Sequence, residues 1–323
     1  MDIDAKRWLL GMAAAVWVGC AGAQAWPAKP LTIVVGTPQA GATDAYVRTV
    51  AEFMSGTLGQ PVLVENKPGA NGNISAEQVL RAPADGYTIW MGTQSMTEIN
   101  PSAFPGLRWK LDDFVGIIKG VEAPLVLIVH PDVGARSLAD LGAWLKAHPD
   151  KAAYASFSPG TPSHFLGFQL AERLGVPMTH VPYKGSAPQV QAILGRHVLL
   201  GFTQLQTAVP HVKEGRLAAL ATTGKTRWRQ LPEVPTLAEL GREDLSATIW
   251  FGLFARRGMP DDVYRRIVDA AVKAHADPAV KMRLVAMGFD VPGLTDPEFT
   301  AGIRDSQRRW AAIVKATGFK ATN

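Results

Sequence analysis

The sequence predicts an α/β protein. Short runs rich in β-branched and aromatic residues recur along the chain, and segments with helical spacing separate most of them. Because strands that alternate with helices form parallel sheets with right-handed crossovers, we expect parallel sheets. The predicted strands cover residues 31–35, 61–66, 87–92, 125–130, 152–157, 179–183, 198–202, 217–222 and 249–255.

The spacing of apolar residues also predicts the helices. Those between the strands cover residues 44–59, 137–149, 163–175 and 186–195. After residue 258 the pattern is helical only, in segments 260–288 and 295–318. Each of these two has an acidic or proline-containing first turn and ends at Gly. We expect them to pack across the outside of one lobe and assign them no site.

The composition excludes several classes of protein. A chain of 323 residues exceeds one ordinary hydrophobic core, and 47% hydrophobic with 19% charged residues argues against disorder. The net charge is +5, but Lys and Arg are dispersed, so we expect no nucleic-acid partner. Cys20 is the only cysteine, which removes disulfides and cysteine metal sites from the cleaved protein.

The first 25 residues predict a secretory signal peptide. A basic pair precedes the apolar run 8–18, and a small-residue AQA triplet ends at Ala25. We therefore expect cleavage near Ala25 and a mature protein in the periplasm. Lipidation of Cys20 is the alternative, although Trp17 stands where a lipobox usually has Leu.

Candidate binding loops follow four of the predicted strands. In open parallel sheets, ligands bind beyond the carboxyl ends of the strands. The loops at residues 36–43, 93–97, 157–164 and 183–186 lie there and carry small or hydrogen-bonding residues. From them we predict these ligand-binding residues: Thr37, Ala40, Gly41, Ala42, Thr43, Thr93, Gln94, Ser158, Gly160, Thr161, His164, Tyr183 and Lys184.

The loop at 36–43 joins glycines to the start of a helix. Backbone N–H groups at a helix N-terminus favour an anion, and Asp44 or Thr43 can cap that terminus. A capped tight turn without a ligand is the structural alternative. The loop has neither the Gly-Lys-Ser/Thr of a Walker loop nor the G-x-G-x-x-G of a dinucleotide site.

The two later loops add side chains that titrate or carry charge. His164 falls in the first turn of a helix, where it acts as a general base or, in the interpretation that we favour, packs and hydrogen-bonds. Ser186 is the predicted cap of the next helix, with Pro188 in its first turn. Lys184 either neutralises a carboxylate or is a solvated, lobe-bridging lysine.

Signatures of metal and catalytic centres are absent from the sequence. The seven histidines show no H-x-x-x-H spacing, and no G-x-S-x-G occurs. We therefore predict no cofactor, no metal and no catalytic residue. Ser, His and Asp side chains can still converge in a folded chain, so a hydrolase is disfavoured without being excluded.

A set of segments runs in a specific order from Trp26 to about residue 260. They are WPAKPLTIVV, AGATD, GQPVLVENKPGANGNISAEQV, ADGYTIWMGT, NPS, YASFSPGTPSH, HVPYKGSAP, PHVKEGRLAALATTG, LPEVPTLAELG and WFGLFA. In this combination the chain resembles the tripartite tricarboxylate transporter substrate-binding proteins, the Bug or TctC-like family.

The resemblance implies a two-lobed periplasmic-binding-protein fold of type II topology, a Venus flytrap that closes on a small organic carboxylate. One lobe would hold residues 26–126 and 230–323, and the other residues 127–229. In such proteins, backbone amides and ordered waters from loops of both lobes hold the carboxylate. The implied protein partner is a set of membrane permease subunits or a sensor kinase, and the binding protein itself is expected to be a monomer.

This sequence departs from the family pattern at two places. Gly36 and Thr37 stand where the family often has Pro-Phe, which replaces an aromatic wall with a hydroxyl. Thr203 and Gln204 follow Phe202 where Asp-Asn is common, which removes a counter-charge for a ligand ammonium. We add Thr203 and Gln204 to the predicted ligand-binding residues and expect a carboxylate without an α-amino group. The alternative is that Thr203 does not face the ligand.

The sequence thus predicts a solute-binding protein that captures a small organic carboxylate and delivers it to a tripartite tricarboxylate-type permease. The alternative is an exported α/β hydrolase or transferase that uses His164 and a nearby hydroxyl. The export signal and the lack of cofactor motifs and acid/base clusters favour the binding protein.

Overall fold

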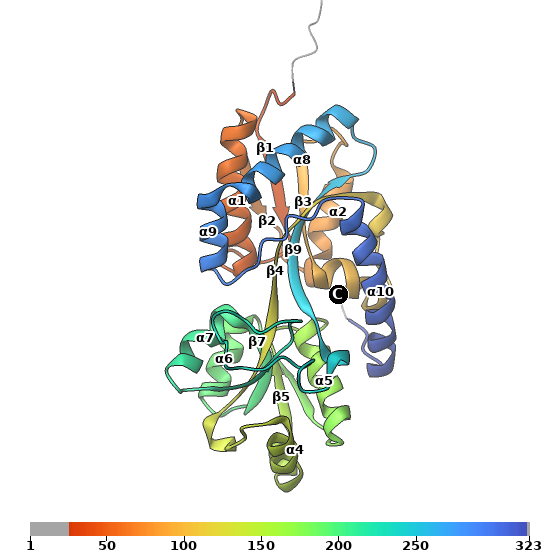
Figure 1. Cartoon of the computed structure of the whole chain (residues 1–323). Coiled ribbons are helices and arrows are strands. Elements are labelled where there is room, and N and C mark those ends of the chain that lie inside the picture. The colour runs from red at the N-terminus through yellow and green to blue at the C-terminus, as the bar shows by residue number, and fades with distance from the viewer. Residues whose placement is uncertain (1–25, 322–323) are drawn as a thin grey trace, which may run out of the picture.

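The structure, a computed structural model, describes residues 26–321, so the predicted signal peptide lies outside it. The chain forms two lobes, with β4 and β9 at their junction (Figure 1). The strands are β1 (Leu31–Val35), β2 (Val62–Asn66), β3 (Thr88–Thr93), β4 (Phe114–Val129), β5 (Ala153–Ser156), β6 (Thr179–Pro182), β7 (Leu200–Gln204), β8 (Ala218–Thr222) and β9 (Thr248–Arg256). The α-helices are α1 (Ala42–Leu58), α2 (Asn73–Arg81), α3 (Asn100–Ala103), α4 (Leu138–Ala147), α5 (Pro162–Leu174), α6 (Ser186–Leu194), α7 (Leu205–Lys213), α8 (Asp261–Ala276), α9 (Pro278–Ala286) and α10 (Glu298–Thr317).

Lobe 1 contains the strands β2, β1, β3, β9 and the first part of β4, in that order across the sheet. β1 runs parallel to both neighbours, with Leu31 opposite Val62 and Thr32 opposite Thr88. β9 runs antiparallel to β3 and β4. The expectation of parallel sheets is therefore right only in part, because β9 returns from lobe 2 and enters the sheet in the opposite direction.

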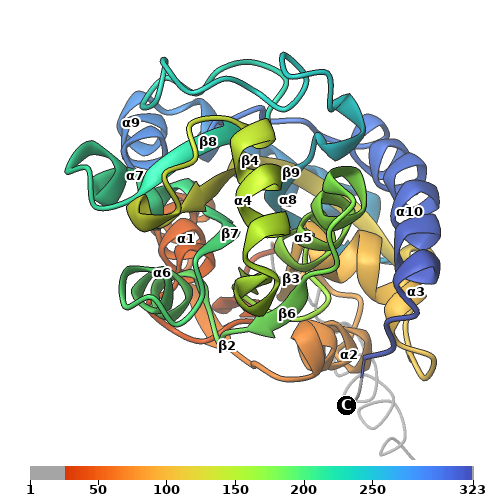
Figure 2. The same ribbon diagram turned by 90° about the horizontal axis from the view of Figure 1, so that it is seen from below.

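Lobe 2 repeats this mixture of strand directions. β5 runs parallel to β6 and β7, whereas the last part of β4 runs antiparallel to β7 and β8. Helices α4, α5, α6 and α7 surround this sheet (Figure 2). Each lobe therefore has parallel strands whose carboxyl ends carry loops, as a ligand site in an α/β protein requires.

β4 passes from one lobe to the other without a break. Its residues from Phe114 to Pro124 pair with β9, and those from Leu125 to Val129 pair with β7. The sequence pattern predicted a strand only at 125–130, because glycines and charged residues interrupt the apolar alternation of the earlier half.

One of those glycines has a packing role. A Cβ at Gly120 would overlap the Tyr46 hydroxyl and the His275 ring. Tyr46 of α1 and His275 of α8 hydrogen-bond each other at 3.1 Å in the buried core over the sheet. β4 approaches these helices so closely that position 120 requires glycine. This packing explains why the alternation of apolar residues along β4 is interrupted there.

The C-terminal helices differ from the prediction at one point. Segment 260–288 forms two helices, α8 and α9, because the Asp277 carboxylate caps the second by accepting from the N–H groups of Ala279 and Val280 at 2.9 and 3.0 Å. Pro278 stands at the first position of α9, where its missing N–H costs nothing. As expected, α8 and α9 pack against α1 on lobe 1.

α10 lies within the predicted helical segment 295–318, and it contacts more of the molecule than expected. It ends at Gly318, which has a left-handed φ of 65°. Its Trp310 ring lies 6.1 Å from that of Phe165 in α5, so α10 contacts lobe 2 as well as lobe 1.

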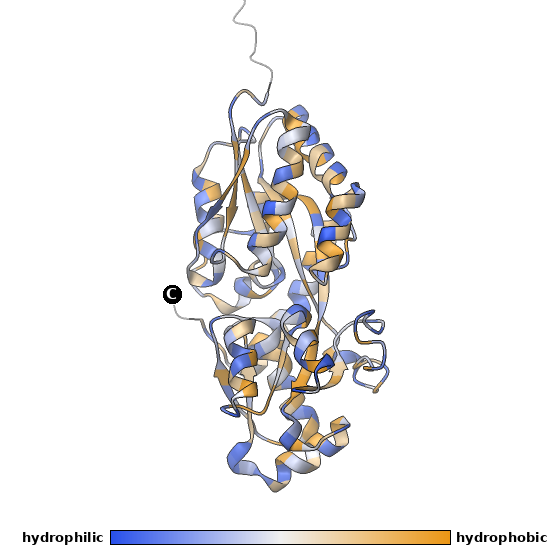
Figure 3. Cartoon of the chain, turned by 90° about the vertical axis from the view of Figure 1, so that its left-hand side faces the viewer, coloured by the Kyte–Doolittle hydropathy of each residue, from blue (hydrophilic) through white to orange (hydrophobic). Residues whose placement is uncertain are grey.

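Apolar residues concentrate inside both lobes, and polar residues cover their helices on the outside (Figure 3). The largest buried cluster spans strands of both lobes and includes Val35, Val121, Leu127 and Phe202. Between residues 26 and 321, none of the helices combines the length and apolar character needed to cross a bilayer.

Candidate functional site

The loop after β1 leads into a helix without a side-chain cap. The N-cap residue of α1 is Gly41. The predicted caps are wrong, because the Thr43 hydroxyl pairs with the Thr37 hydroxyl and the Asp44 carboxylate accepts from the Ala40 N–H at 3.1 Å. The side chains of Thr43 and Asp44 thus hydrogen-bond to residues of the preceding loop. The N-terminus of α1, which is the positive end of its dipole, has no side-chain cap.

Asp44 anchors this loop from inside. The residue is 5% exposed, and its carboxylate also accepts hydrogen bonds from Arg48 at 2.9 Å and Asn66 at 3.0 Å. Burial raises the pKa of Asp44, but the bonds from Arg48, Asn66 and the Ala40 N–H outweigh burial and hold the pKa below its usual range. The carboxylate is therefore ionised at neutral pH and fixes the loop conformation.

A second loop of lobe 1 follows β2 and lies against the first. Its residues Gly69, Ala70, Asn71 and Gly72 all have positive φ, at 135°, 45°, 51° and 88°. Ala70 and Asn71 adopt this conformation despite their Cβ atoms, at a cost on the order of 1 kcal/mol each. Gly36 packs closely against Gly72, so the two loops form one surface.

An asparagine network stabilises the loop at 69–72. Asn71 Nδ2 donates to Asn100 Oδ1 at 2.7 Å, and Asn100 Nδ2 donates to the Asn71 carbonyl at 3.1 Å and to Asn73 Oδ1 at 2.7 Å. Asn100 is fully buried, and Asn73 is 4% exposed. Buried, mutually bonded amides of this kind rigidify a loop because each would be costly to leave unpaired.

Thr93 and Gln94 bond within lobe 1. Thr93 Oγ1 accepts from the Met96 N–H at 3.3 Å, and Gln94 Nε2 donates to the buried Glu98 carboxylate at 2.8 Å. Gln94 Oε1 is buried and has no hydrogen-bond partner in the part of the chain that the structure describes. A role for these two residues in ligand binding stays a prediction.

In lobe 2, hydroxyl groups shape the loop at 157–164. Thr161 Oγ1 donates to the Ser158 carbonyl at 2.7 Å, and Ser163 Oγ donates to the Phe202 carbonyl at 2.5 Å. Ser163 Oγ also accepts from the Phe157 N–H at 3.3 Å. Thr161 is the N-cap residue of α5, but its side chain makes no capping bond. The start of α5 therefore resembles that of α1.

His164 belongs to an aromatic column. Its ring stacks on that of His180 with 3.8 Å between centroids, and it meets the edge of Phe319 at 5.0 Å. Its Nδ1 accepts from the Gly160 N–H at 3.3 Å, and His180 Nε2 pairs with Ser156 Oγ at 2.6 Å.

The two stacked histidines are neutral at physiological pH. Burial, with the neighbouring His180 ring adding to it, lowers the pKa of His164 to about 3, and burial lowers the pKa of His180 to about 4. A ring with so low a pKa is a weak general base. This geometry agrees with the packing interpretation of His164.

The loop at 183–186 differs from the prediction at its cap. Gly185, with φ 113°, is the N-cap residue of α6, and Ser186 instead donates to Gln204 Oε1 at 3.1 Å. Pro188 lies in the first turn, as predicted. Tyr183 is half-buried, and this burial raises the pKa of its hydroxyl. Lys184 is exposed and forms no ion pair within residues 26–321.

Thr203 is the second-last residue of the buried strand β7. It is fully buried and lies opposite Val126 of β4. Its Oγ1 finds no hydrogen-bond partner among the described residues. Whether Thr203 and Gln204 contact a ligand stays a prediction.

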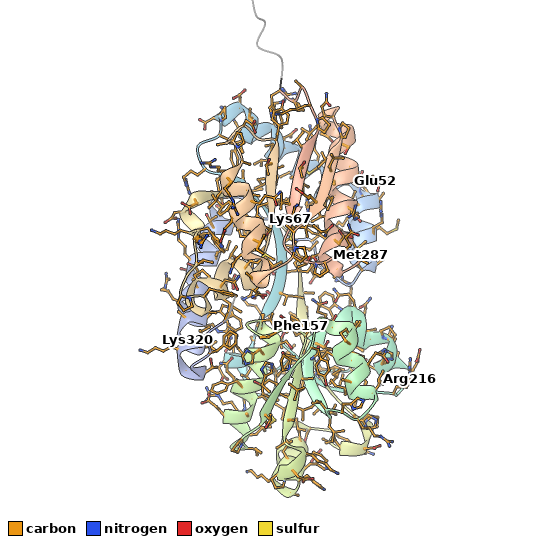
Figure 4. All side chains as sticks on the ribbon, turned by 180° about the vertical axis from the view of Figure 1, so that it is seen from behind. Glu52, Lys67, Phe157, Arg216, Met287 and Lys320 are labelled. Atoms are coloured by element: carbon orange, nitrogen blue, oxygen red, sulfur yellow. The ribbon has the colours of Figure 1, made fainter. Side chains whose placement is uncertain are left out.

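The predicted residues form two groups, one on each lobe, and contacts between the lobes link these groups. A Cβ at Gly160 would stand 3.6 Å from Asn71 Nδ2 and 3.3 Å from the Phe319 ring. Phe157, at the start of the same loop, lies where lobe 2 meets lobe 1 (Figure 4). The structure thus brings the loop at 157–164 to the loop at 69–72, which in turn packs on Gly36. Within the described chain, no group of three or more His, Cys, Asp or Glu side chains is arranged to hold a metal ion.

Comparison with known proteins decides the family. The model of the tripartite tricarboxylate transporter family receptor, TctC, matches residues 46–319. This chain belongs to the TctC family. Protein BugT of Bordetella pertussis (strain Tohama I) is 33% identical over 305 residues, which cover 92% of each chain.

Two solved structures are similar to this TctC-family chain along nearly its whole length. MatC from Rhodopseudomonas palustris with bound malate is 29% identical with a TM-score of 0.78, and covers 90% of this chain and 100% of its own. The R. palustris protein Rpa4515 with adipate is 28% identical with a TM-score of 0.82, and covers 91% and 99%. The family resemblance and the two-lobed periplasmic-binding-protein fold are therefore confirmed.

The loop at 69–72 is the part of this TctC surface that sequence analysis missed. It follows the predicted strand at 61–66 and contains the dipeptides Pro-Gly and Asn-Gly, which mark turns with positive φ. The rule that ligand loops follow strand ends would have included it. Its glycines and Asn71 also meet the criterion of small or hydrogen-bonding residues, but the loop has no charged or hydroxyl side chain between Lys67 and Ser75.

Proposed function

We propose that this chain captures a small organic carboxylate between its lobes and delivers it to a membrane permease of the tripartite tricarboxylate type. One observation carries the proposal: α1, α5 and α6 begin at loops of both lobes, and none has a side-chain capping bond. Uncapped helix starts offer N–H donors and a positive dipole end, which favour a carboxylate.

Lobe closure is the proposed mechanism. Because β4 continues through both lobes, bending at this junction changes the distance between the two groups of loops. A carboxylate that accepts hydrogen bonds from both groups stabilises the closed arrangement and shifts the population toward it. Asp44 and the asparagine network hold the lobe 1 donors in place before the ligand arrives, which reduces the entropy lost on binding.

We propose a ligand without an α-amino group. Thr203 and Gln204 offer no carboxylate to pair with an ammonium, and a buried unpaired ammonium is costly. The malate of MatC and the adipate of Rpa4515, which both lack an amino group, support this choice.

The remaining parts of the proposal concern location and partners. The mature protein is periplasmic after cleavage near Ala25, acts as a monomer, and hands its ligand to permease subunits or a sensor kinase. It uses no cofactor and is not an enzyme. Lobe 1 comprises residues 26–126 and the chain from β9 onward, and lobe 2 the residues between. The expected boundary at 230 is moved to the start of β9, because Leu231 and Val234 pack with Val126 and Ile128 of lobe 2.

Matched ligand pairs test the proposal. L-malate and L-aspartate differ only in a hydroxyl against an ammonium, and calorimetric titration of residues 26–323 should show tighter binding of L-malate. Adipate and L-2-aminoadipate extend the comparison to a longer chain. A ligand at about 100 times its Kd stabilises the fold by roughly 2.7 kcal/mol, which a thermal shift of several degrees reports.

Two results would contradict the proposal. Tighter binding of the amino acids would overturn the choice of ligand. Consumption of a carboxylate, followed by NMR of the ligand in the presence of the protein, would favour the enzyme that uses His164.

A further inference from the structure

A cavity of about 400 Å³ lies outside the surface formed by the predicted ligand loops. None of the predicted ligand-binding residues lines it. Its walls come from β4, β9, the chain between β8 and β9, and α10, which flanks β9 (Figure 1). The volume falls within the range of small-molecule sites, roughly 300–1,000 Å³. We call it the junction cavity, because β4 passes between the lobes beside it.

The junction cavity has an apolar floor. Trp250, Phe299, Ile303 and Trp310 line it, and each is at most 4% exposed overall. Aromatic and aliphatic walls of this kind bind the apolar body of a ligand by removing its surface from water.

Three cationic side chains line the same cavity: Lys119, Lys225 and Arg309. Lys119 is paired with Glu122, and Arg309 donates to the Asp244 carbonyl at 2.8 Å. Lys225 is exposed and belongs to none of the ion pairs between residues 26 and 321. The charge of Lys225 is therefore available to a ligand.

Two carboxyl groups also line the cavity, so its cationic side chains outnumber its acidic ones by three to two. Glu98 is 4% exposed, and its oxygens already accept from Gln94, Trp250 and Ser306 at 2.8, 2.9 and 2.5 Å. Glu243, the other acidic lining residue, lies exposed on the surface. Ser246 adds a polar group that can bind a ligand, because its Oγ is buried and has no hydrogen-bond partner in the described chain.

From this lining we propose that the junction cavity is a second binding site, which takes a small organic anion with an apolar or aromatic body. The apolar part lies on Trp250, Phe299 and Trp310, and the anionic group lies toward Lys225 and Arg309 with Ser246 as a donor. The site stands independently of the proposed function, since it shares no residue with the loops assigned to the transported ligand.

A glycine in α10 allows this site to be filled without disturbing the fold. Gly302 lines the cavity, and a Cβ built there meets no heavy atom within 4 Å. We expect Gly302→Phe to extend into the cavity, because this residue lines it. Gly56 of α1 is the matched control, because it is also helical and its Cβ also meets nothing within 4 Å. Both substitutions remove a glycine from a helix interior, which stabilises the helix.

Calorimetric titration with 2-naphthoate tests the proposal on residues 26–323. The unsubstituted protein and Gly56→Phe should bind it equally, Gly302→Phe should bind at least ~10-fold more weakly, and Lys225→Ala about 5-fold more weakly. The neutral analogue 2-naphthamide should bind the unsubstituted protein more weakly than 2-naphthoate.

Three results would overturn the proposal. The first is no binding of 2-naphthoate to the unsubstituted protein. The second is equal affinity of Gly302→Phe and Gly56→Phe, which would place the probe elsewhere. The third is equal affinity for the acid and the amide. Lys225→Ala keeps the charge part testable on an exposed position should Gly302→Phe fail to fold. Titration of L-malate tests the ligand loops separately, so failure at one site is distinguishable from failure at the other.

Discussion

The two lobes build their facing loops by different physical means. In lobe 1, four successive positive φ values and an asparagine network hold the loop at 69–72, and the ionised Asp44 holds the loop at 36–43. In lobe 2, hydroxyl-to-carbonyl bonds and a stack of neutral histidines hold the loop at 157–164. Lobe 1 therefore depends on backbone conformation and on a carboxylate, and lobe 2 on uncharged imidazoles. Substitution should damage lobe 1 more, and mild acid should weaken lobe 2 first.

The largest expected effect is that of Gly72→Ala in lobe 1. The φ of Gly72 is 88°, and a Cβ there would overlap the Met96 side chain. Left-handed strain and overpacking together should lower the free energy of unfolding by about 3 kcal/mol. Urea denaturation measures the change. Gly56→Ala is the control, and it should be neutral or stabilising by up to ~1 kcal/mol. Equal stability of the two variants would show that the loop relaxes freely.

Mild acid tests the histidine stack of lobe 2. Because the folded pKa values of His164 and His180 are about 3 and about 4, below the usual value of 6.5, the unfolded chain binds more protons at pH 4–6. The contribution of the stack is complete above pH 6.5 and is lost as the pH falls toward 4. Each histidine contributes a slope of up to about 1.4 kcal/mol per pH unit.

His180→Phe isolates that contribution. Phe keeps a ring between His164 and Tyr154 and removes one titrating group. The slope of unfolding free energy against pH, measured by urea denaturation at about pH 4.5–6, should fall by about 1 kcal/mol per unit. His197→Gln, at an exposed histidine, should leave it unchanged. An unaltered slope in His180→Phe would mean that the stack does not titrate in this range.

Asp44→Asn probes the carboxylate of lobe 1. The amide keeps the shape but loses the charge-assisted bond to Arg48, so the variant should be about 2 kcal/mol less stable at pH 7. Because the folded pKa of Asp44 lies below its usual value of 3.8, the difference should be present above pH 3.8 and disappear as the pH falls further. Asp269→Asn, which breaks an exposed pair with Lys273, should cost under ~0.5 kcal/mol. A difference between Asp44→Asn and the unsubstituted protein that persists at low pH would contradict the role of the charge.

Strands, helices and loop positions were predictable because they depend on local periodicity. Each of the nine predicted strands overlaps an observed one, and the helix predicted at 163–175 matches α5. The caps were not predictable. Thr43, Asp44 and Ser186 all belong to residue types that commonly cap helices. The Asp44 carboxylate instead accepts a hydrogen bond from the Ala40 N–H, and Asn66 and Arg48 donate the other hydrogen bonds that it accepts. Ser186 likewise finds Gln204, 18 residues away. Arg48 is a local partner on the same helix, but Asn66 and Gln204 lie on other elements, and such tertiary partners leave no local pattern.

The loop at 69–72 and the junction cavity were missed for a related reason. The residues from Gly69 to Gly72 act through a run of positive φ values, which depends on the buried partners of Asn71 and Gly72 and not on residue type alone. The junction cavity joins residues as far apart as Glu98 and Arg309, and both C-terminal segments were expected to be structural only. The resemblance to the TctC family predicted the two lobes correctly. It did not predict the residues of the loop at 69–72 or those of the junction cavity.

The smallest expected effect compares two glycines with the same backbone conformation in lobe 2. Gly134 and Gly160 have φ of 67° and 68°, so the backbone strain of an alanine, about 1 kcal/mol, is common to both. A Cβ at Gly134 meets nothing within 4 Å, whereas one at Gly160 stands 3.3 Å from Phe319 and 3.6 Å from Asn71. Gly160→Ala should therefore be only ~0.5 kcal/mol less stable than Gly134→Ala, because the half-buried Phe319 ring follows the end of α10 and can shift. A difference as large as that expected for Gly72→Ala would mean that lobe 2 holds its loop as tightly as lobe 1, and the contrast between the lobes would fail.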